Sequence, residues 1–369
     1  MSELNPKPTR KRKAPPATDA KAPAVKLNGT NMEAPSATPS PAPATPTATQ
    51  TVTTSPAPAA PAALATPPPP PEKTLSQIFS DFLTLIYDEN PLGKKKELCE
   101  CVNKIVVGAM KRNHAYPNYN WLIIYDPVTM VRSDIDNIYK AINSFKTKSD
   151  IGLIVNSGGG HIEPAYLISK LCRESSKRKF VAVVPRRAKS AATLLCCGAD
   201  EIHMGQLSEL GPIYPQFNDL PALGLKNAVQ HVAELASQYP KAAEMFAKYL
   251  SSSLSLANLG YYERVAESAV QYAERLLKKR ITPLNGNPQK VATQLVYGYK
   301  DHGFVIDSAE AESIFGAAMI KGGTSEYDLA NSVYEWLSLI ESTSKSAGYG
   351  FYMYGHPESE PSFYKLDKK

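Results

Sequence analysis

Long apolar stretches are missing from the 369-residue chain, which has no run of about 18 apolar residues that could form a membrane-spanning helix. Glycine does not recur at every third position, and this excludes a collagen-like protein. No apolar segment follows the first residues, Met-Ser-Glu-Leu-Asn, so we expect no secretory signal. These absences predict a protein that does not contact membranes.

Cysteine is scarce, with five residues in an odd number and no repeated CxxC pair. This excludes a disulfide framework or a zinc site and predicts free thiols in a reducing cytoplasm. Histidine and cysteine never occur at metal-ligand spacing, and no motif demands an organic cofactor, so we expect neither. The cysteines are Cys99, Cys101, Cys172, Cys196 and Cys197.

Positive charge is concentrated at one end of the chain. Lys and Arg number 41 against 35 Asp and Glu, and residues 1–73 hold eight basic but only four acidic side chains. The remaining residues are nearly neutral, whereas a folded domain that binds nucleic acid concentrates Lys and Arg on its surface. The only polyanion contact we expect is a weak one by the basic tail, through residues 10–13.

Composition divides the chain into three parts. Residues 1–73 contain 18 of the 31 prolines and almost no large apolar side chains, which predicts a disordered Pro/Ala/Thr-rich tail. Residues 74–355 have a globular composition and are predicted to form one domain. Residues 356–369 are interpreted as an extended or loose C-terminal tail.

Short apolar runs alternate with amphipathic helices between residues 74 and 204. This alternation predicts an α/β fold with a mostly parallel sheet flanked by helices. Further helices are predicted near 225–238, 240–253, 260–280 and 325–342. The earlier helices are predicted from 74, at 95–113, 134–145, 162–175 and 190–197, and the strands at 121–126, 151–155, 180–185 and 201–204.

A glycine-rich turn, Ser157-Gly158-Gly159-Gly160-His161, follows the second predicted strand. Three glycines let the backbone turn tightly and approach a ligand, and the following helix start favours negative charge. The turn lacks the lysine of a phosphate-gripping nucleotide loop. By itself the pattern fits either an anion or oxyanion cradle or a purely structural strand-to-helix turn.

Ser190 stands at the next strand-to-helix junction, within Ala188-Lys189-Ser190-Ala191-Ala192-Thr193. A serine here can expose its hydroxyl as a nucleophile, and the N–H of Ala191 can stabilise an oxyanion. The alternative is that Ser190 only caps the helix. Both turns follow the carboxyl ends of parallel strands, so we expect them to share one rim of the sheet.

The glycine turn and the Ser190 turn are followed by two further characteristic segments. These are residues 199–204 and Leu210-Gly211-Pro212-Ile213-Tyr214-Pro215-Gln216. In this order, the four segments resemble the serine dehydrogenase proteinase family. That family belongs to the crotonase-like superfamily, with the Clp proteases and signal peptide peptidase A. The resemblance covers roughly residues 115–320 and is most specific over 151–216.

The resemblance implies a role for each matching residue. It implies that Ser190 is the nucleophile and that the N–H groups of Gly159 and Ala191 form the oxyanion hole. It implies that the glycine turn and a groove loop, Gly211–Gln216, contact the substrate. It also implies a homo-oligomer, because crotonase-like chains usually assemble into trimers, hexamers or larger rings. The substrate-binding residues implied are Gly158, Gly160, His161, Gly211, Pro212 and Ile213.

The general base is left open by the sequence. The helix at about 260–279, where Ser-Lys relatives place their base, has no lysine before Lys278, and no histidine stands at 212–216. His302 is our first choice, because it follows Asp301 near the place where Clp-type enzymes carry their triad carboxylate. Imidazole also suits general-base work near neutral pH. The other candidates are Lys189, Lys226, Lys241, His161, His203 and His231.

The sequence therefore predicts a cytoplasmic serine endopeptidase that acts on a peptide or protein through a Ser190 acyl-enzyme. One alternative is an inactive or weakly active peptide-binding relative, favoured by the missing base. A second alternative is a crotonase-type enzyme for acyl-thioesters, for which a serine at position 190 would be superfluous.

Overall fold

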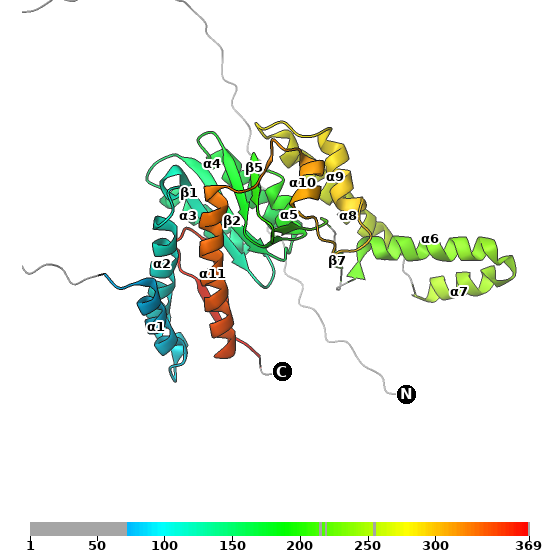
Figure 1. The fold of residues 1–369 in the computed structure, drawn as a ribbon. Coiled ribbons are helices and arrows are strands. Elements are labelled where there is room, and N and C mark those ends of the chain that lie inside the picture. The colour runs from blue at the N-terminus through cyan, green and yellow to red at the C-terminus, as the bar shows by residue number, and fades with distance from the viewer. Residues whose placement is uncertain (1–71, 214–215, 218–219, 254–255, 368–369) are drawn as a thin grey trace, which may run out of the picture. The chain divides into compact units, whose positions relative to one another are not determined.

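The computed structural model describes residues 72–213, 216–217, 220–253 and 256–367 (Figure 1). All but the last two residues of the tail expected at 1–73 lie outside this part of the chain. Among the described residues, none of the helices combines the length and the apolar character that crossing a membrane requires.

A mixed and mostly parallel sheet forms the centre of the fold, with strand order β11-β10-β1-β2-β3-β5-β9. The strands from β1 to β9 are parallel, whereas β10 is antiparallel to both β1 and β11. This confirms the predicted fold class. The strands of this path are β1 (Tyr119–Asp126), β2 (Asp150–Ser157), β3 (Phe180–Val184), β5 (Glu201–Met204), β9 (Ile320–Lys321), β10 (Tyr349–Gly355) and β11 (Ser362–Lys365).

Both faces of the sheet are buried, which explains why its strands are continuous apolar runs. In β1, Leu122 and Ile124 join one hydrophobic cluster, while Trp121 and Ile123 join the cluster on the opposite face. This is the two-residue periodicity of a strand. The first cluster is covered by α3 (Ser133–Ser144), α4 (Ile162–Ser175), α5 (Ala191–Cys196), α8 (Leu256–Lys278), α9 (Pro288–Tyr297) and α10 (Ser308–Phe315).

The opposite face is covered by three helices from the two ends of the domain: α1 (Leu75–Ile86), α2 (Lys95–Lys111) and α11 (Ser325–Ser346). Figure 1 shows these three helices side by side. Thr74 starts α1 with a capping box, since its hydroxyl accepts the Gln77 N–H and the Gln77 side chain accepts the Thr74 N–H. Short 3₁₀ turns η1 (Pro91–Lys94) and η2 (Tyr116–Asn118) flank α2.

The C-terminal residues correct one sequence expectation. The segment 356–369, interpreted as an extended or loose tail, is extended at Ser362–Lys365, but there it forms β11 and pairs with β10 as part of the sheet. Phe363 packs against Phe351 of β10 with their ring centroids 5.2 Å apart, and both are buried. The packed aromatic side chains supply the apolar area that holds this edge in place.

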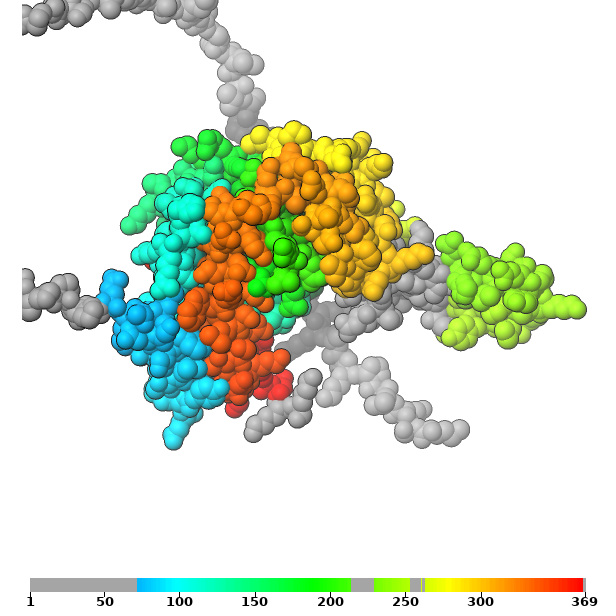
Figure 2. Space-filling view, viewed as in Figure 1, coloured from blue at the N-terminus to red at the C-terminus, as the bar shows by residue number. Residues whose placement is uncertain are grey.

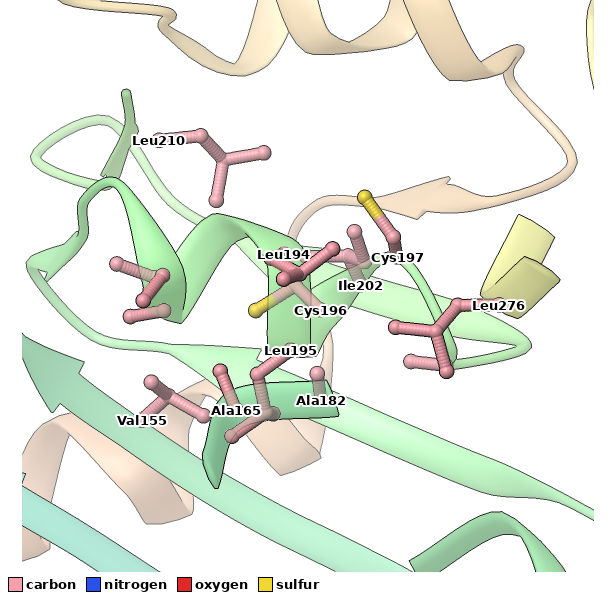
Figure 3. Packing of buried hydrophobic residues seen from close by; sticks show 14 of the residues in the cluster. Val155, Ala165, Ala182, Leu194, Leu195, Cys196, Cys197, Ile202, Leu210 and Leu276 are labelled. Carbon is pink, nitrogen blue, oxygen red and sulfur yellow. The ribbon is translucent and has the colours of Figure 1, made fainter. Parts of the chain in front are cut away.

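Two very short strands extend the carboxyl end of β2, beyond the residues that pair with β3. They are β4 (Arg187–Ala188) and β6 (Glu209–Leu210), with Ala188 opposite both Ser157 and Leu210. They bring the segments around residues 157, 188 and 210 side by side. The helix that follows β4, α5, is wholly buried, and Figure 3 shows its residues Leu194, Leu195 and Cys196 among side chains of β2, β3 and β5.

After β6 the chain forms a helical hairpin. The strands β7 (Gln216–Phe217) and β8 (Leu220–Pro221) lead into α6 (Ala222–Gln238), the 3₁₀ turn η3 (Pro240–Ala242) and α7 (Ala243–Ser253). Figure 2 shows the described side chains of residues 229–252, from the second half of α6 into α7, grouped in one lobe. The helices predicted near 225–238 and 240–253 are confirmed.

Candidate active site

Ser190 lies between β4 and α5 in an unusual backbone conformation, with φ 51° and ψ −117°. Among the described residues it is the one non-glycine residue with a positive φ. Such a conformation costs about 1–3 kcal/mol for a residue with a Cβ and persists where the surrounding structure enforces it. Ser190 is half-buried and occupies the N-cap position of α5, but its side chain makes no capping hydrogen bond. The capping alternative therefore does not explain this serine.

The glycine turn touches the Ser190 turn directly. Gly159 has φ 108°, and a Cβ added to it would lie 2.9 Å from the Ser190 Cβ and 3.0 Å from the Ala191 nitrogen. Only a residue without a side chain allows this close approach. The expectation that the two turns share one rim of the sheet is confirmed.

The remaining glycines of the turn have different surroundings. Gly160, with φ 143°, lies against the backbone of Met130, whose N–H donates to Gly159 O at 2.9 Å and whose carbonyl accepts the His161 N–H at 3.0 Å. Gly158 is exposed, and an added Cβ would meet nothing within 4 Å. His161 is exposed at the N-cap of α4.

The two N–H groups expected to stabilise an oxyanion differ in their bonding. Ala191 is the first residue of α5, where a backbone N–H has no partner within the helix. The N–H of Gly159 donates to the hydroxyl oxygen of buried Ser157 at 3.1 Å. An oxyanion at this position would therefore have to share the Gly159 donor with Ser157.

The first part of the predicted groove loop, Gly211–Ile213, lies beside the nucleophile turn. Tyr214 and Pro215 of this loop lie outside the described residues. The Thr193 hydroxyl of α5 lies 2.8 Å from Gly211 O and accepts the Gly211 N–H at 3.1 Å. A Cβ added to Gly211 would lie 2.5 Å from the Lys189 Cδ. All three loop residues, including Pro212, are buried, and the Ile213 N–H donates to Leu295 O.

His302 lies in the loop that runs from Asp301 to Ile306. Ile306 exchanges two backbone hydrogen bonds with Leu210 of β6, at 2.9 and 3.1 Å, which draws the loop toward the Ser190 rim. Burial lowers the pKa of His302 from its ordinary value of 6.5; the Asp301 carboxylate opposes this shift and the charge of Lys189 adds to it. With its pKa below 6.5, most of the imidazole is neutral at pH 7, and the neutral form is the one that a general base requires.

The other candidates for the general base have surroundings that differ from those of His302. The Lys189 ammonium contacts three oxygen acceptors, so its protons are already used. His203 is buried in β5, which β3 separates from β2, and its two ring nitrogens lie against Thr324 and Glu201. Lys241 in η3 and His231 on α6 are exposed. Lys226 belongs to α6, but its side chain lies outside the described residues.

The cysteines near the rim and the arrangement of possible metal ligands also bear on the chemistry of the site. Cys196 and Cys197 of α5 are buried free thiols, and burial raises the pKa of Cys197 to about 12, so a reactive thiolate is disfavoured. In the part of the chain that the structure describes, His, Cys, Asp and Glu side chains do not gather in threes as a metal ion would require.

Residues 96–239 match the family model of the ClpP-like SDH-type serine proteinases. The match confirms the family resemblance seen in the sequence, and it includes the glycine turn, Ser190 and the groove loop but not His302. The chain is also similar to two uncharacterized proteins of Methanocaldococcus jannaschii. One is 29% identical over 147 residues, 39% of this chain and 50% of that protein. The other is 27% identical over 164 residues, 42% of this chain and 55% of that protein. The chain thus spans about half the length of these relatives.

Sequence reasoning missed two parts of the site. It did not find Met130, whose backbone fixes the glycine turn, because nothing in its local sequence marks that role. It also did not find Thr193 as the link between α5 and the groove loop. A threonine three residues after a candidate nucleophile, on a buried helix, was the one available signal.

Proposed function

We propose that the protein is a serine peptidase in which Ser190 attacks the carbonyl carbon of a peptide bond. The observation that carries this proposal is the contact between the Gly159 and Ser190 turns, which includes a serine held at positive φ. A strained turn at the start of a helix presents a hydroxyl beside backbone N–H groups, as acyl transfer requires. The match to the serine proteinase family over residues 96–239 supports the same reaction.

The proposed reaction proceeds through an acyl-enzyme. As the Ser190 oxygen forms its bond to the substrate carbon, its proton passes to the general base, for which we propose His302. The oxyanion accepts hydrogen bonds from the N–H groups of Ala191 and Gly159. The C–N bond of the substrate then breaks, and the leaving amine takes the proton from the base. Water then attacks the ester, losing a proton to the same base, and Ser190 is released with its hydroxyl restored.

Substrate binding, assembly and location complete the proposal. We propose that a peptide or protein substrate binds along Gly158, Gly160 and His161 on one side and Gly211–Ile213 on the other. The exposed side chains of α7, Met245 and Tyr249, support assembly into a homo-oligomer. Five free thiols fit a reducing cytoplasm.

A second candidate is a peptide-binding protein without hydrolytic activity. The hydrogen bond from the Gly159 N–H to Ser157 favours it, because one of the two proposed oxyanion donors is already engaged. Such a protein would bind extended peptides without reacting at Ser190.

The test is covalent labelling by a fluorophosphonate, followed by identification of the modified residue. We expect labelling at Ser190, and we expect the Ser190→Ala variant to lose both labelling and peptide hydrolysis while it unfolds at an unchanged temperature. Ser342→Ala, an exposed helix serine, serves as the control and should behave as wild type. Hydrolysis that survives in Ser190→Ala would refute the assignment.

A further inference from the structure

The side chain of Lys189, directly before Ser190, connects two other segments of the chain. Its Nζ forms an ion pair with the Glu209 carboxylate at 2.9 Å and donates to the carbonyls of Phe304 at 3.1 Å and Leu210 at 3.3 Å. The side chain is only 15% exposed. Three acceptors match the three protons of an ammonium group, so the contacts favour one fixed position for this charge.

The three acceptors of the Lys189 ammonium lie on two segments that are hydrogen-bonded to each other, β6 and the 301–306 loop. Glu209 and Leu210 form β6, which pairs with β4, and Phe304 belongs to the loop that carries His302. Leu210 and Ile306 already join β6 to that loop through two backbone hydrogen bonds. Lys189 adds a second attachment, two residues nearer to His302.

The backbone of Lys189 forms hydrogen bonds on the side of the site that faces the glycine turn. Its N–H donates to Ser157 O at 3.0 Å, and its carbonyl accepts the Ala192 N–H at 2.9 Å. The same carbonyl would lie 2.8 Å from a Cβ added to Gly159. Lys189 therefore contacts the glycine turn through its backbone and the His302 loop through its side chain.

We propose that Lys189 is a positioning residue that clamps the 301–306 loop to the nucleophile turn and thereby holds His302 in place. The importance of this clamp for hydrolysis rests on the proposed function. Two charged groups that act on His302 are Asp301, in its own loop, and Lys189, which is paired with Glu209. Burial, Asp301 and Lys189 together set the protonation of the imidazole, so the clamp acts on both its position and its charge.

Two measurements that need no activity test the clamp. The variants are Lys189→Met, which removes all three contacts, and Lys189→Arg, which keeps the charge. In Lys189→Met we expect the Ile306 amide to exchange with solvent deuterium at least ten-fold faster, and the NMR titration midpoint of His302 to move upward. In Lys189→Arg both values should stay close to wild type. Unchanged exchange and an unchanged midpoint in Lys189→Met would overturn the proposal.

A second variant guards against a folding defect. Lys189→Met leaves the Glu209 carboxylate without its ion pair, so the double variant Lys189→Met/Glu209→Gln removes that charge as well. We expect it to fold and to show the same faster exchange of Ile306. A stable double variant with wild-type exchange would also overturn the clamp.

Fluorophosphonate labelling then separates the clamp from the proposed reaction. With an active wild type, we expect the rate of Ser190 labelling to fall at least ten-fold in Lys189→Met and less in Lys189→Arg. A labelling rate that stays at the wild-type value in Lys189→Met would contradict the role of the clamp in positioning His302. A wild type that does not label at Ser190 would refute the peptidase function, while the exchange and titration measurements would still decide whether the clamp exists.

Discussion

Ser190 and its glycine neighbours show how single residues define this rim. The serine adopts a positive φ, which is unfavourable for a residue with a side chain. Gly159 also has a positive φ, and its lack of a side chain allows it to lie against the serine. Gly158 has neither constraint, since its φ is not positive and the space around it is open. Two consecutive glycines therefore have different reasons for their presence, and substitution can tell them apart.

Replacing Gly158 by alanine should stabilise the protein by about 0.4–1 kcal/mol, because the unfolded chain loses conformational freedom and the folded chain has room. Gly159→Ala is the matched variant, and it should lower stability by more than this and abolish labelling of Ser190. Urea denaturation monitored by circular dichroism measures both effects. Equal stabilities for the two variants would contradict the contact between the turns.

At the scale of elements, a partly buried polar network joins β5 to the residues that directly precede β3 and α11. The Glu201 carboxylate pairs with Lys179 at 2.5 Å and with His203 at 3.3 Å. The other ring nitrogen of His203 lies 2.7 Å from the hydroxyl of Thr324, the N-cap of α11. Because all three segments contribute, this network should stabilise the domain in a pH-dependent way.

Burial by itself would raise the pKa of Glu201, but hydrogen bonds and charge from His203 and Lys179 outweigh it and lower the pKa from 4.5 to about 2. A carboxyl whose pKa is lower in the folded state stabilises the protein above its unfolded pKa, here 4.5. That stabilisation disappears as the pH falls toward 2.

We therefore expect Glu201→Gln to lose roughly 2–3 kcal/mol of unfolding free energy at pH 7. The difference from wild type should shrink steadily between pH 4.5 and pH 2.5. Urea denaturation across this pH range measures it, and the exposed Glu89→Gln provides a control with the same chemical change. A difference that stays constant with pH would exclude the network as its source.

Elements with strong local signals could be predicted from the sequence, and elements that depend on distant partners could not. The helix at 162–175 and the meeting of the 157–160 and 188–193 turns followed from periodicity and from the geometry of parallel strands. The pairing of β11 with β10 was not predicted, because the glycine and proline residues near these aromatic side chains are typical of an unpaired tail. The surroundings of His302 depend on Lys189 and Leu210, more than 90 residues earlier, and no local pattern encodes such contacts.

At the scale of the whole molecule, the hairpin of α6 and α7 is the feature that the rest of the fold does not explain. Phe246 and Leu250 of α7 are half-buried, while Met245 and Tyr249, one turn apart, are 62% and 66% exposed. Tyr239, which directly precedes η3 in the same hairpin, is 60% exposed. Neighbouring exposed apolar side chains of this size commonly mark protein contacts.

We expect the double variant Met245→Glu/Tyr249→Glu to reduce the mass of the assembly, because two charges would face the apolar contact. Light scattering at micromolar concentration measures the mass of each variant. Lys241→Gln/Lys248→Gln changes the net charge by the same two units on exposed positions of the same hairpin and should leave the mass unchanged. A wild type that is already a monomer would contradict the proposed homo-oligomer.

The antiparallel pairing of β10 with β1 has a consequence for how the protein is made. The partner of Ile123–Tyr125 lies at Met353–Gly355, about 230 residues later in the chain. At ribosomal speeds of about 5–20 residues per second, the side of β1 that pairs with β10 stays unpaired for roughly 10–50 s, until its partner has been synthesised. During that interval the nascent chain exposes an unpaired apolar edge, so a chaperone that shields it until translation ends should raise the yield of native protein.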